Sequence, residues 1–196
     1  MAKGPEHLKF TDAAAWRAWL DEHHAKAAEA HVLLAKGKTA GLKKPQALDE
    51  ALAYGWIDGV GRPVDADWWV QRFTPRTRRS RWSRVNVDKV GVLIAAGRMH
   101  EAGLAQVAAA KADGRWYEAY EPPSTIAVPP DLAAALEANP PARNAFEGLD
   151  GANRFAVLYR VTQVKKAETR ARKIEDFVAV LARGEVLHPP RKAKPK

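Results

Sequence analysis

The chain has 196 residues, of which 46% are hydrophobic and 28% are charged, as in an ordinary soluble globular protein of one or two domains. It contains no cysteine, which excludes disulfide bonds and thiolate chemistry. The net charge of +9 is clustered, because six basic and no acidic residues lie in 71–84, and eleven basic and four acidic residues lie in 160–196. Such clustering indicates either a surface that faces an anionic partner or a solubilising surface with a basic tail.

A helix and a buried strand are predicted first along the chain. Thr11 or Asp12 can cap a helix whose apolar face contains Trp16, Trp19, Leu20 and His23. The short apolar run 30–35 predicts a buried strand, and a loop rich in Lys and Gly follows over 37–45. A second helix is predicted over 48–54, because Gly55 stands where a helix commonly ends.

Residues 56–73 predict a β-hairpin, because the turn-forming stretch 62–65 separates two runs of strand-forming residues. Alternation along the return strand places Trp68 and Trp69 on opposite faces, so we expect one buried face and one partly covered groove. Pro75 ends this strand. Two helices are then predicted, one that begins over 80–83 and ends at Gly97, and an Ala-rich one over 100–112.

The character of the chain changes at 121–130, where four prolines in nine residues predict a stiff connector. Every later pattern is helical, with helices predicted over 131–138, 140–146 and 152–166 and a last one capped by Thr169. The sequence therefore predicts an α+β fold, in which a small antiparallel sheet with flanking helices over 8–120 precedes a C-terminal helical module over 126–188. Residues 189–196 are predicted from their composition to form a disordered basic tail.

Two blocks of residues carry a resemblance to a known family. The first block comprises Gly55-Trp56-Ile57-Asp58-Gly59, Arg72-Phe73-Thr74-Pro75-Arg76, Trp82-Ser83 and Asn86. The second block comprises Val128-Pro129-Pro130-Asp131-Leu132, Ala145-Phe146 and the basic run 165–174. On these motifs the chain resembles the YdeI/OmpD-associated family, also called bacteriocin-protection proteins, over roughly residues 8–188. The resemblance implies an α+β N-terminal part, a helical C-terminal module and a bacterial stress or envelope-protection role without an established reaction.

An anion-binding pocket in a non-enzymatic binding protein is the leading functional hypothesis. Arg72 on a strand and Arg76 after a proline have fixed positions, from which their forked donors can hold an anionic group. Tryptophans can pack beside that group, although core packing is their structural alternative, and a solvated face is the alternative for the arginines. The predicted pocket residues are Trp56, Asp58, Arg72, Thr74, Arg76, Trp82, Ser83 and Asn86.

Two other functions are carried as alternatives. Nucleic-acid binding would use the basic segments 71–84 and 160–196, including a basic patch that lines one or two helical turns and is otherwise a charged solvent face. The patch residues are Lys165, Lys166, Arg170, Arg172 and Lys173. A small-molecule enzyme would use Asp58 as a general base beside an arginine clamp, whereas the structural alternative makes Asp58 a turn or capping carboxylate.

No cofactor or metal is expected, because the six histidines lack the spacing of metal ligands. The expected partner is an anionic small molecule or peptide, with nucleic acid as an alternative and no protein partner identified. The N-terminal residues contain no apolar leader, and the longest uncharged run, 90–97, is far shorter than a bilayer span. These patterns predict a cytoplasmic protein that does not insert into a membrane.

Overall fold

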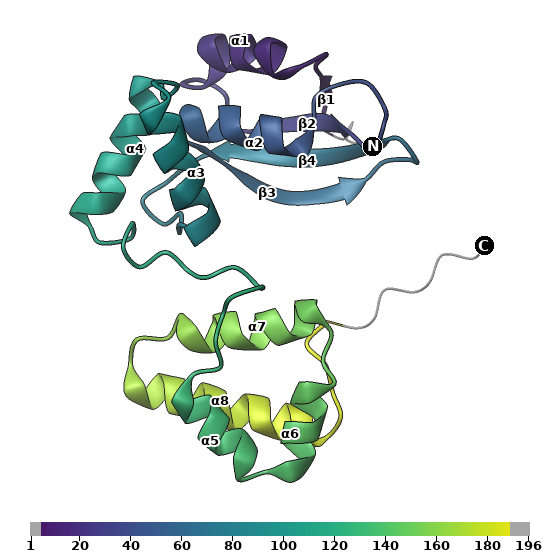
Figure 1. The fold of residues 1–196 in the computed structure, drawn as a ribbon, viewed down its shortest axis with the longest axis vertical. Coiled ribbons are helices and arrows are strands. Elements are labelled where there is room, and N and C mark those ends of the chain that lie inside the picture. The colour runs from purple at the N-terminus through teal and green to yellow at the C-terminus, as the bar shows by residue number, and fades with distance from the viewer. Residues whose placement is uncertain (1–4, 189–196) are drawn as a thin grey trace. The chain divides into compact units, whose positions relative to one another are not determined.

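The computed structural model describes residues 5–188, so the predicted basic tail at 189–196 lies outside the described residues. The chain divides into two compact units, Met1–Ala119 and Tyr120–Lys196. The N-terminal unit contains β1 (His7–Lys9), α1 (Ala13–His23), β2 (Ala30–Ala35), α2 (Lys44–Ala53), β3 (Trp56–Pro63), β4 (Trp68–Pro75), α3 (Arg84–Ala95) and α4 (Glu101–Ala112) (Figure 1). The C-terminal unit contains α5 (Pro130–Glu137), α6 (Pro140–Glu147), α7 (Gly151–Thr162) and α8 (Ala167–Ala182).

The N-terminal unit is built on one open, four-stranded sheet in the order β1-β2-β4-β3. The β2–β4 and β3–β4 pairs are antiparallel, which confirms the predicted α+β class and the predicted hairpin. The short edge strand β1 adds a parallel pair with β2 that the sequence did not predict. Three residues are too few for an alternating pattern to be visible, so only the tertiary pairing reveals β1.

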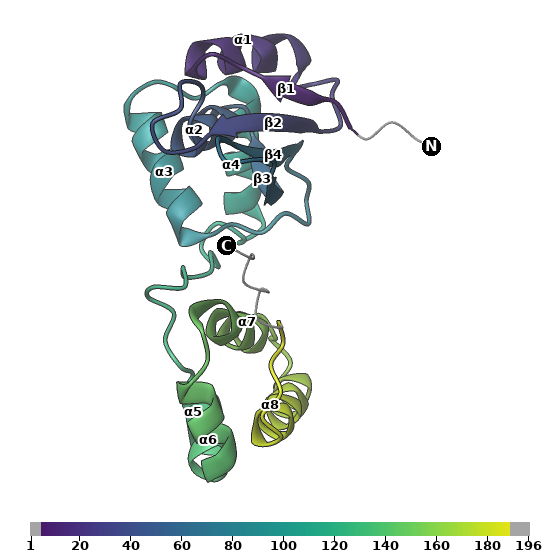
Figure 2. The same ribbon diagram turned by 90° about the vertical axis from the view of Figure 1, so that its right-hand side faces the viewer.

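The two faces of this sheet have different surroundings. Trp69 lies opposite Leu34, and Phe73 lies opposite Ala30, on the face that packs into a core shared with α1 and α2. The rings of Trp16 on α1 and Phe73 on β4 have centroids 5.7 Å apart within that core. Trp68 belongs to the other face, and among the described residues no helix lies over that face (Figure 2).

Local signals place several element ends correctly. The Asp12 side chain caps α1 by accepting a hydrogen bond from the backbone N–H of Ala15 at 2.9 Å. Gly55 follows α2 with φ of +74°, a conformation that favours glycine. Helix α2 begins at Lys44, four residues before its predicted start, because Pro45 occupies the first turn, where its missing N–H costs nothing.

The region 130–182 of the C-terminal unit is helical, as predicted. Its buried core contains Leu132, Leu136, Ala142, Phe146, Val157, Leu158, Val161, Ile174, Phe177 and Leu181. Two predicted boundaries in this unit were wrong. Helix α7 ends at Thr162 and not at residue 166, and α8 is capped at Lys166 and not at Thr169. The backbone N–H of Arg170 donates to the Lys166 carbonyl at 2.9 Å, so the first turn of α8 forms before Thr169 is reached.

Candidate functional site

The structure disperses the eight predicted pocket residues instead of gathering them around one cavity. Trp56 is 1% exposed in the core, where its indole Nε1 donates to the His24 carbonyl at 3.3 Å. Arg72 lies on the open face of the sheet, and its Nε forms an ion pair with Glu29 at 2.6 Å. Its guanidinium is therefore committed to a partner within the protein, and Trp56 offers no open ring face to a ligand.

Arg76 and Trp82 do meet, but they meet inside the protein. Arg76 is only 5% exposed, its guanidinium carbon lies 3.5 Å from the centroid of the Trp82 ring, and its Nη1 donates to the Arg81 carbonyl at 3.1 Å. Trp82 is 2% exposed and packs edge-on against Trp116, with ring centroids 4.9 Å apart. This buried cation–π pair is arranged to hold the loop that precedes α3.

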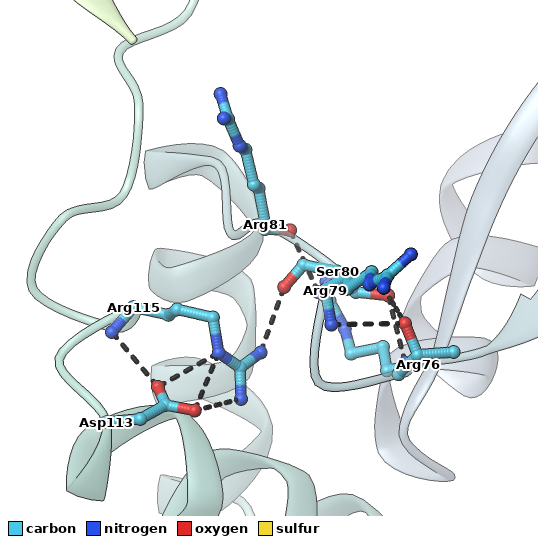
Figure 3. A network of polar contacts seen from close by, with 7 residues as sticks. Arg76, Arg79, Ser80, Arg81, Asp113 and Arg115 are labelled. Carbon is cyan, nitrogen blue, oxygen red and sulfur yellow. Dashed lines mark hydrogen bonds and ion pairs between the residues drawn. The ribbon is translucent and has the colours of Figure 1, made fainter. Parts of the chain in front are cut away.

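A second arginine anchors the same loop from outside. Figure 3 shows the guanidinium of Arg115 between the Asp113 carboxylate and the backbone carbonyl of Ser80. The two contacts measure 2.7 Å to Asp113 and 2.9 Å to Ser80. Hydrogen bonding to Arg115 holds the pKa of Asp113 below its usual value, because the ionised carboxylate is the better acceptor. The polar groups around Arg76 thus position a loop.

Asp58 and Thr74 complete the part of the predicted pocket that lies on the hairpin. Asp58 pairs in register with Phe73, and Thr74 pairs with Ile57. Because successive strand residues point to opposite faces, Asp58 shares a face with Phe73, while Arg72 points to the other face. The predicted clamp between Asp58 and Arg72 is therefore not assembled on this hairpin, where Arg72 is paired with Glu29 instead.

Ser83 and Asn86 form the start of α3. Ser83 is the N-cap, and its hydroxyl oxygen accepts a hydrogen bond from the backbone N–H of Asn86 at 3.2 Å. Asn86 is itself only 7% exposed. The helix therefore begins beside the predicted range 80–83, and the oxygen of the Ser83 hydroxyl serves the helix as its cap.

The predicted basic patch, which lies just before and in the first turns of α8, includes one arginine that is used within the C-terminal unit. Arg170 binds the Asp131 carboxylate through two nitrogens, at 2.5 Å and 2.9 Å, and also donates to the Val161 carbonyl at 2.7 Å. These hydrogen bonds lower the pKa of Asp131. Lys173 lies half-buried with its ammonium 5.8 Å from the Phe177 ring centroid. The remaining patch residues are exposed, namely Lys165, Lys166 and Arg172.

A buried polar cluster that the sequence did not predict joins α1, α2 and the residue before α4. Tyr54 is 3% exposed, donates its hydroxyl hydrogen to Asp21 and stacks on His100 with ring centroids 4.8 Å apart. Burial, followed by the hydrogen bond to Asp21, raises the pKa of Tyr54 to about 12. Glu50 is 4% exposed and accepts hydrogen bonds from Arg17 and Arg98. The ion pairs and hydrogen bonds of this cluster therefore connect α1, α2 and the segment before α4.

A cleft of the N-terminal unit opens instead at Trp68, where β4 begins. This Trp68 cleft has a volume of about 340 Å³ and is lined by Lys9, Phe10, Thr11, Ala40, Gly41 and Trp68. The ammonium of Lys9 lies 4.3 Å from the centroid of the Trp68 ring. Gly41 has φ of +131°, and a Cβ there would stand 3.0 Å from Cη2 of Trp68. A glycine is therefore required both by the backbone and by the ring that floors the cleft.

The lining of the Trp68 cleft defines the chemistry that it can accept. Its walls are mostly apolar, and Lys9 supplies a positive charge at an aromatic surface. An ammonium held over a ring can exchange that contact for an ion pair with an incoming anion. The sequence offered one signal for this site, because the alternation of Trp68 and Trp69 predicted a groove. The contributions of Lys9 and Gly41 depend on tertiary pairing and were missed.

The N-terminal unit is thus a mixed sheet with helices on one face, and the C-terminal unit is a helical domain. Residues 8–106 match the family described as Domain of unknown function (DUF8412), and the chain belongs to that family. Residues 125–184 match the family described as Bacteriocin-protection, YdeI or OmpD-Associated. The predicted resemblance is confirmed for this C-terminal part, whereas its predicted extent over 8–188 was too large, since the match covers 125–184.

The C-terminal match suggests a bacterial protein related to the envelope or to stress. Searches of the curated proteins and of the solved structures find no match to the chain. Among the helices of residues 5–188, none has the length and hydrophobicity that crossing a membrane requires. In the same residues no group of three His, Asp or Glu side chains is placed to hold a metal ion.

Proposed function

We propose that this protein is a non-enzymatic binding protein of bacterial stress or envelope protection, and that it captures a small amphipathic anion in the Trp68 cleft. An amphipathic anion here means an apolar body that carries one carboxylate, sulfonate or phosphate group. The observation that carries the proposal is the ammonium of Lys9 held 4.3 Å from the Trp68 ring centroid in a mostly apolar cleft. The protective role follows from the family of residues 125–184.

The dimensions of the cleft suit a small ligand. A volume of about 340 Å³ lies at the lower end of the range for small-molecule sites, where a few polar groups orient a mainly apolar ligand. Each Å² of apolar surface removed from water contributes about 25 cal/mol, so the body of the ligand would supply most of the affinity. Lys9 would select for the negative charge and fix the orientation of the ligand.

The proposal keeps the anionic ligand predicted from the sequence and moves its site. Arg76 and Trp82 contact one another with exposed fractions of 5% and 2%, so a ligand would have to displace one of them to be bound. Trp68 is only half-buried and borders the cleft directly. A half-buried aromatic beside a cavity is the better ligand platform, because its apolar surface is already partly exposed to solvent.

Nucleic-acid binding is the second candidate function, and the exposed loop between β4 and α3 is the feature that favours it. Arg78 and Arg79 are both exposed in this loop. Their charge would act on phosphates in a strongly salt-dependent way, with a log–log slope of about −0.7 per contact for a single strand. Fluorescence anisotropy of a labelled single-stranded oligonucleotide, at low and at physiological salt, tests this function directly.

Titration with octanoate tests the leading proposal. Octanoate carries an apolar chain and one carboxylate, and octanol is the matched ligand without charge. All seven tryptophans lie in the N-terminal unit, so their indole N–H signals in an NMR spectrum report on this unit alone. We expect octanoate to shift the Trp68 signal, and octanol to bind more weakly.

Two variants complete this experiment. Lys9→Gln should weaken octanoate binding by about fivefold, the scale of a partly exposed ion pair, while Lys26→Gln, at an exposed lysine outside the cleft, should leave it unchanged. Equal affinities for octanoate and octanol, or equal effects of the two variants, would refute the proposed function.

A further inference from the structure

We infer that a second site for an amphipathic anion lies on the opposite face of β4, at Trp69. The cleft there, called the Trp69 cleft, has a volume of about 320 Å³ and is lined by Leu34, Ala35, Lys36, Lys44 and Trp69. Trp68 and Trp69 are consecutive residues of one strand, so their side chains leave opposite faces of the sheet. Each therefore borders a separate cleft of nearly the same size.

The indole of Trp69 is fixed before any ligand arrives. Its Nε1 donates to Oε1 of Gln71 at 3.3 Å, and Gln71, which is 1% exposed, donates through Nε2 to the Gly59 carbonyl at 2.6 Å. A Cβ at Gly61 would stand 2.3 Å from the Trp69 Nε1, which is closer than atoms can approach. Gly61 therefore leaves the space that the indole occupies, as Gly41 does for Trp68. Such preorganisation lowers the entropic cost of binding.

The charges at this cleft are positive and come from two lysines with different roles. Lys36 donates through Nζ to the Asp65 carbonyl at 2.5 Å, so its stem is held along the cleft. Lys44 is exposed at the start of α2, and within residues 5–188 its ammonium makes no hydrogen bond or ion pair. An ammonium beside apolar walls and an indole is complementary to an apolar molecule that carries one anionic group.

Asp65 and Asp67, in the adjoining hairpin turn, are engaged in hydrogen bonds of their own. Asp65 turns its carboxylate into the hairpin turn, where Oδ1 accepts from the backbone N–H groups of Asp67 at 2.8 Å and Trp68 at 2.7 Å. Asp67 accepts a hydrogen bond from the Thr39 hydroxyl at 2.9 Å. Both carboxylates serve the turn and its neighbouring loop. No acidic residue is among those that line the cleft.

The two clefts can be filled independently. In the sheet, Trp69 lies opposite Leu34, and Trp68 lies opposite Ala35. The two sites share the strand but have different glycines and different lysines, Gly61 with Lys44 on one face and Gly41 with Lys9 on the other. One chain is therefore expected to bind two equivalents of ligand. This inference stands even where the Trp68 cleft is empty.

Octanoate titration followed by NMR tests the second site in the same sample as the first. The indole N–H signals of Trp68 and Trp69, assigned through Trp68→Phe and Trp69→Phe variants, should each shift with octanoate. Lys44→Gln should weaken binding at Trp69 by about fivefold and leave binding at Trp68 unchanged. Lys38→Gln, at an exposed lysine of the preceding loop, is the matched control and should change neither.

A second variant acts on the platform. Gly61→Ala should displace the Trp69 indole and abolish the octanoate response at Trp69, whereas Gly41→Ala should affect Trp68 alone. Circular dichroism checks that each variant is folded. If Gly61→Ala does not fold, Lys44→Gln, which changes only an exposed side chain, still tests the site.

The outcomes separate the two sites. A Trp69 signal that stays in place while Trp68 saturates, or equal effects of Lys44→Gln and Lys38→Gln, would overturn the second site and leave the proposed function standing. A response at Trp69 alone would support the second site and refute the proposed function.

Discussion

Replacing Arg76 with alanine distinguishes a residue that holds the fold from one that holds a ligand. The guanidinium is 5% exposed and lies 3.5 Å from the Trp82 ring centroid. A desolvated cation–π contact contributes about 2 kcal/mol, and a hydrogen bond from a charged donor, here to the Arg81 carbonyl, contributes about 1.5–3 kcal/mol. Because such contributions are not additive, we expect Arg76→Ala to lower the free energy of unfolding by about 3 kcal/mol.

Urea unfolding followed by tryptophan fluorescence measures this change, since all seven tryptophans belong to the N-terminal unit. Arg79→Ala is the control, because Arg79 is exposed in the same loop and should change the free energy of unfolding by no more than about 0.5 kcal/mol. In the folded Arg76→Ala protein, octanoate should bind as it does to the original chain. Unchanged stability together with lost octanoate binding would refute the structural role of Arg76.

Three further predictions concern other parts of the chain. Gly41→Ala should reduce octanoate binding at Trp68, measured by the indole N–H shift, because the new Cβ would crowd that ring. Arg170 lowers the pKa of Asp131, so this pair should stabilise the C-terminal unit fully above the ordinary aspartate pKa of about 4. The contribution should be lost as pH falls through the lowered pKa. Acid unfolding followed by far-ultraviolet circular dichroism should show this pH-dependent loss of stability in the original chain and not in Asp131→Asn. The pKa of Tyr54 is raised to about 12, so its contribution to stability should be complete below a pH of about 10 and lost as pH rises towards 12. In an absorbance titration Tyr54 should ionise at a higher pH than an ordinary tyrosine.

Local features of the sequence were sufficient for most of the fold. The cap at Asp12 and the glycine at Gly55 act over a few residues, and both appear in the structure where the pattern placed them. The turn between β3 and β4 forms later than the predicted stretch 62–65, because Arg62 still pairs with Val70 and Pro63 with Trp69. The predicted start of α8 was wrong because another residue near Thr169 could also begin the helix. Thr169 is a good capping residue, yet the chain enters α8 earlier, at Lys166. The hydrogen bond from the Arg170 N–H to the Lys166 carbonyl places Thr169 inside the first turn, so its capping preference does not set the boundary.

The candidate site depended on burial, which residue type does not determine. Trp56 and Trp82 are in the core, while Trp68 and Trp69 are half-buried beside clefts, although all four are the same residue. What separates them is the neighbour supplied by the fold, and Lys9 reaches Trp68 only because the short strand β1 joins the edge of the sheet. The three residues of β1 are too few to form a sequence pattern that predicts this pairing.

The role of Arg76 also depends on burial that the sequence does not determine. An arginine near a tryptophan in the sequence predicts equally well a ligand clamp or a buried cation–π pair. The choice between them depends on whether other elements cover the pair, and Trp116, from the segment after α4, packs against Trp82. A segment about 30 residues away in the chain thus decides the role of Arg76.

Intermolecular nuclear Overhauser effects between octanoate and the tryptophan rings identify the ring that the ligand touches, and so distinguish the Trp68 cleft from a pocket at Arg76. We predict contacts from the octanoate chain to the Trp68 ring and to Gly41, and none to Trp56 or Trp82. Contacts to Trp82 would restore the pocket at Arg76 as the binding site, and the absence of contacts to Trp68 at a saturating octanoate concentration would contradict binding in the Trp68 cleft.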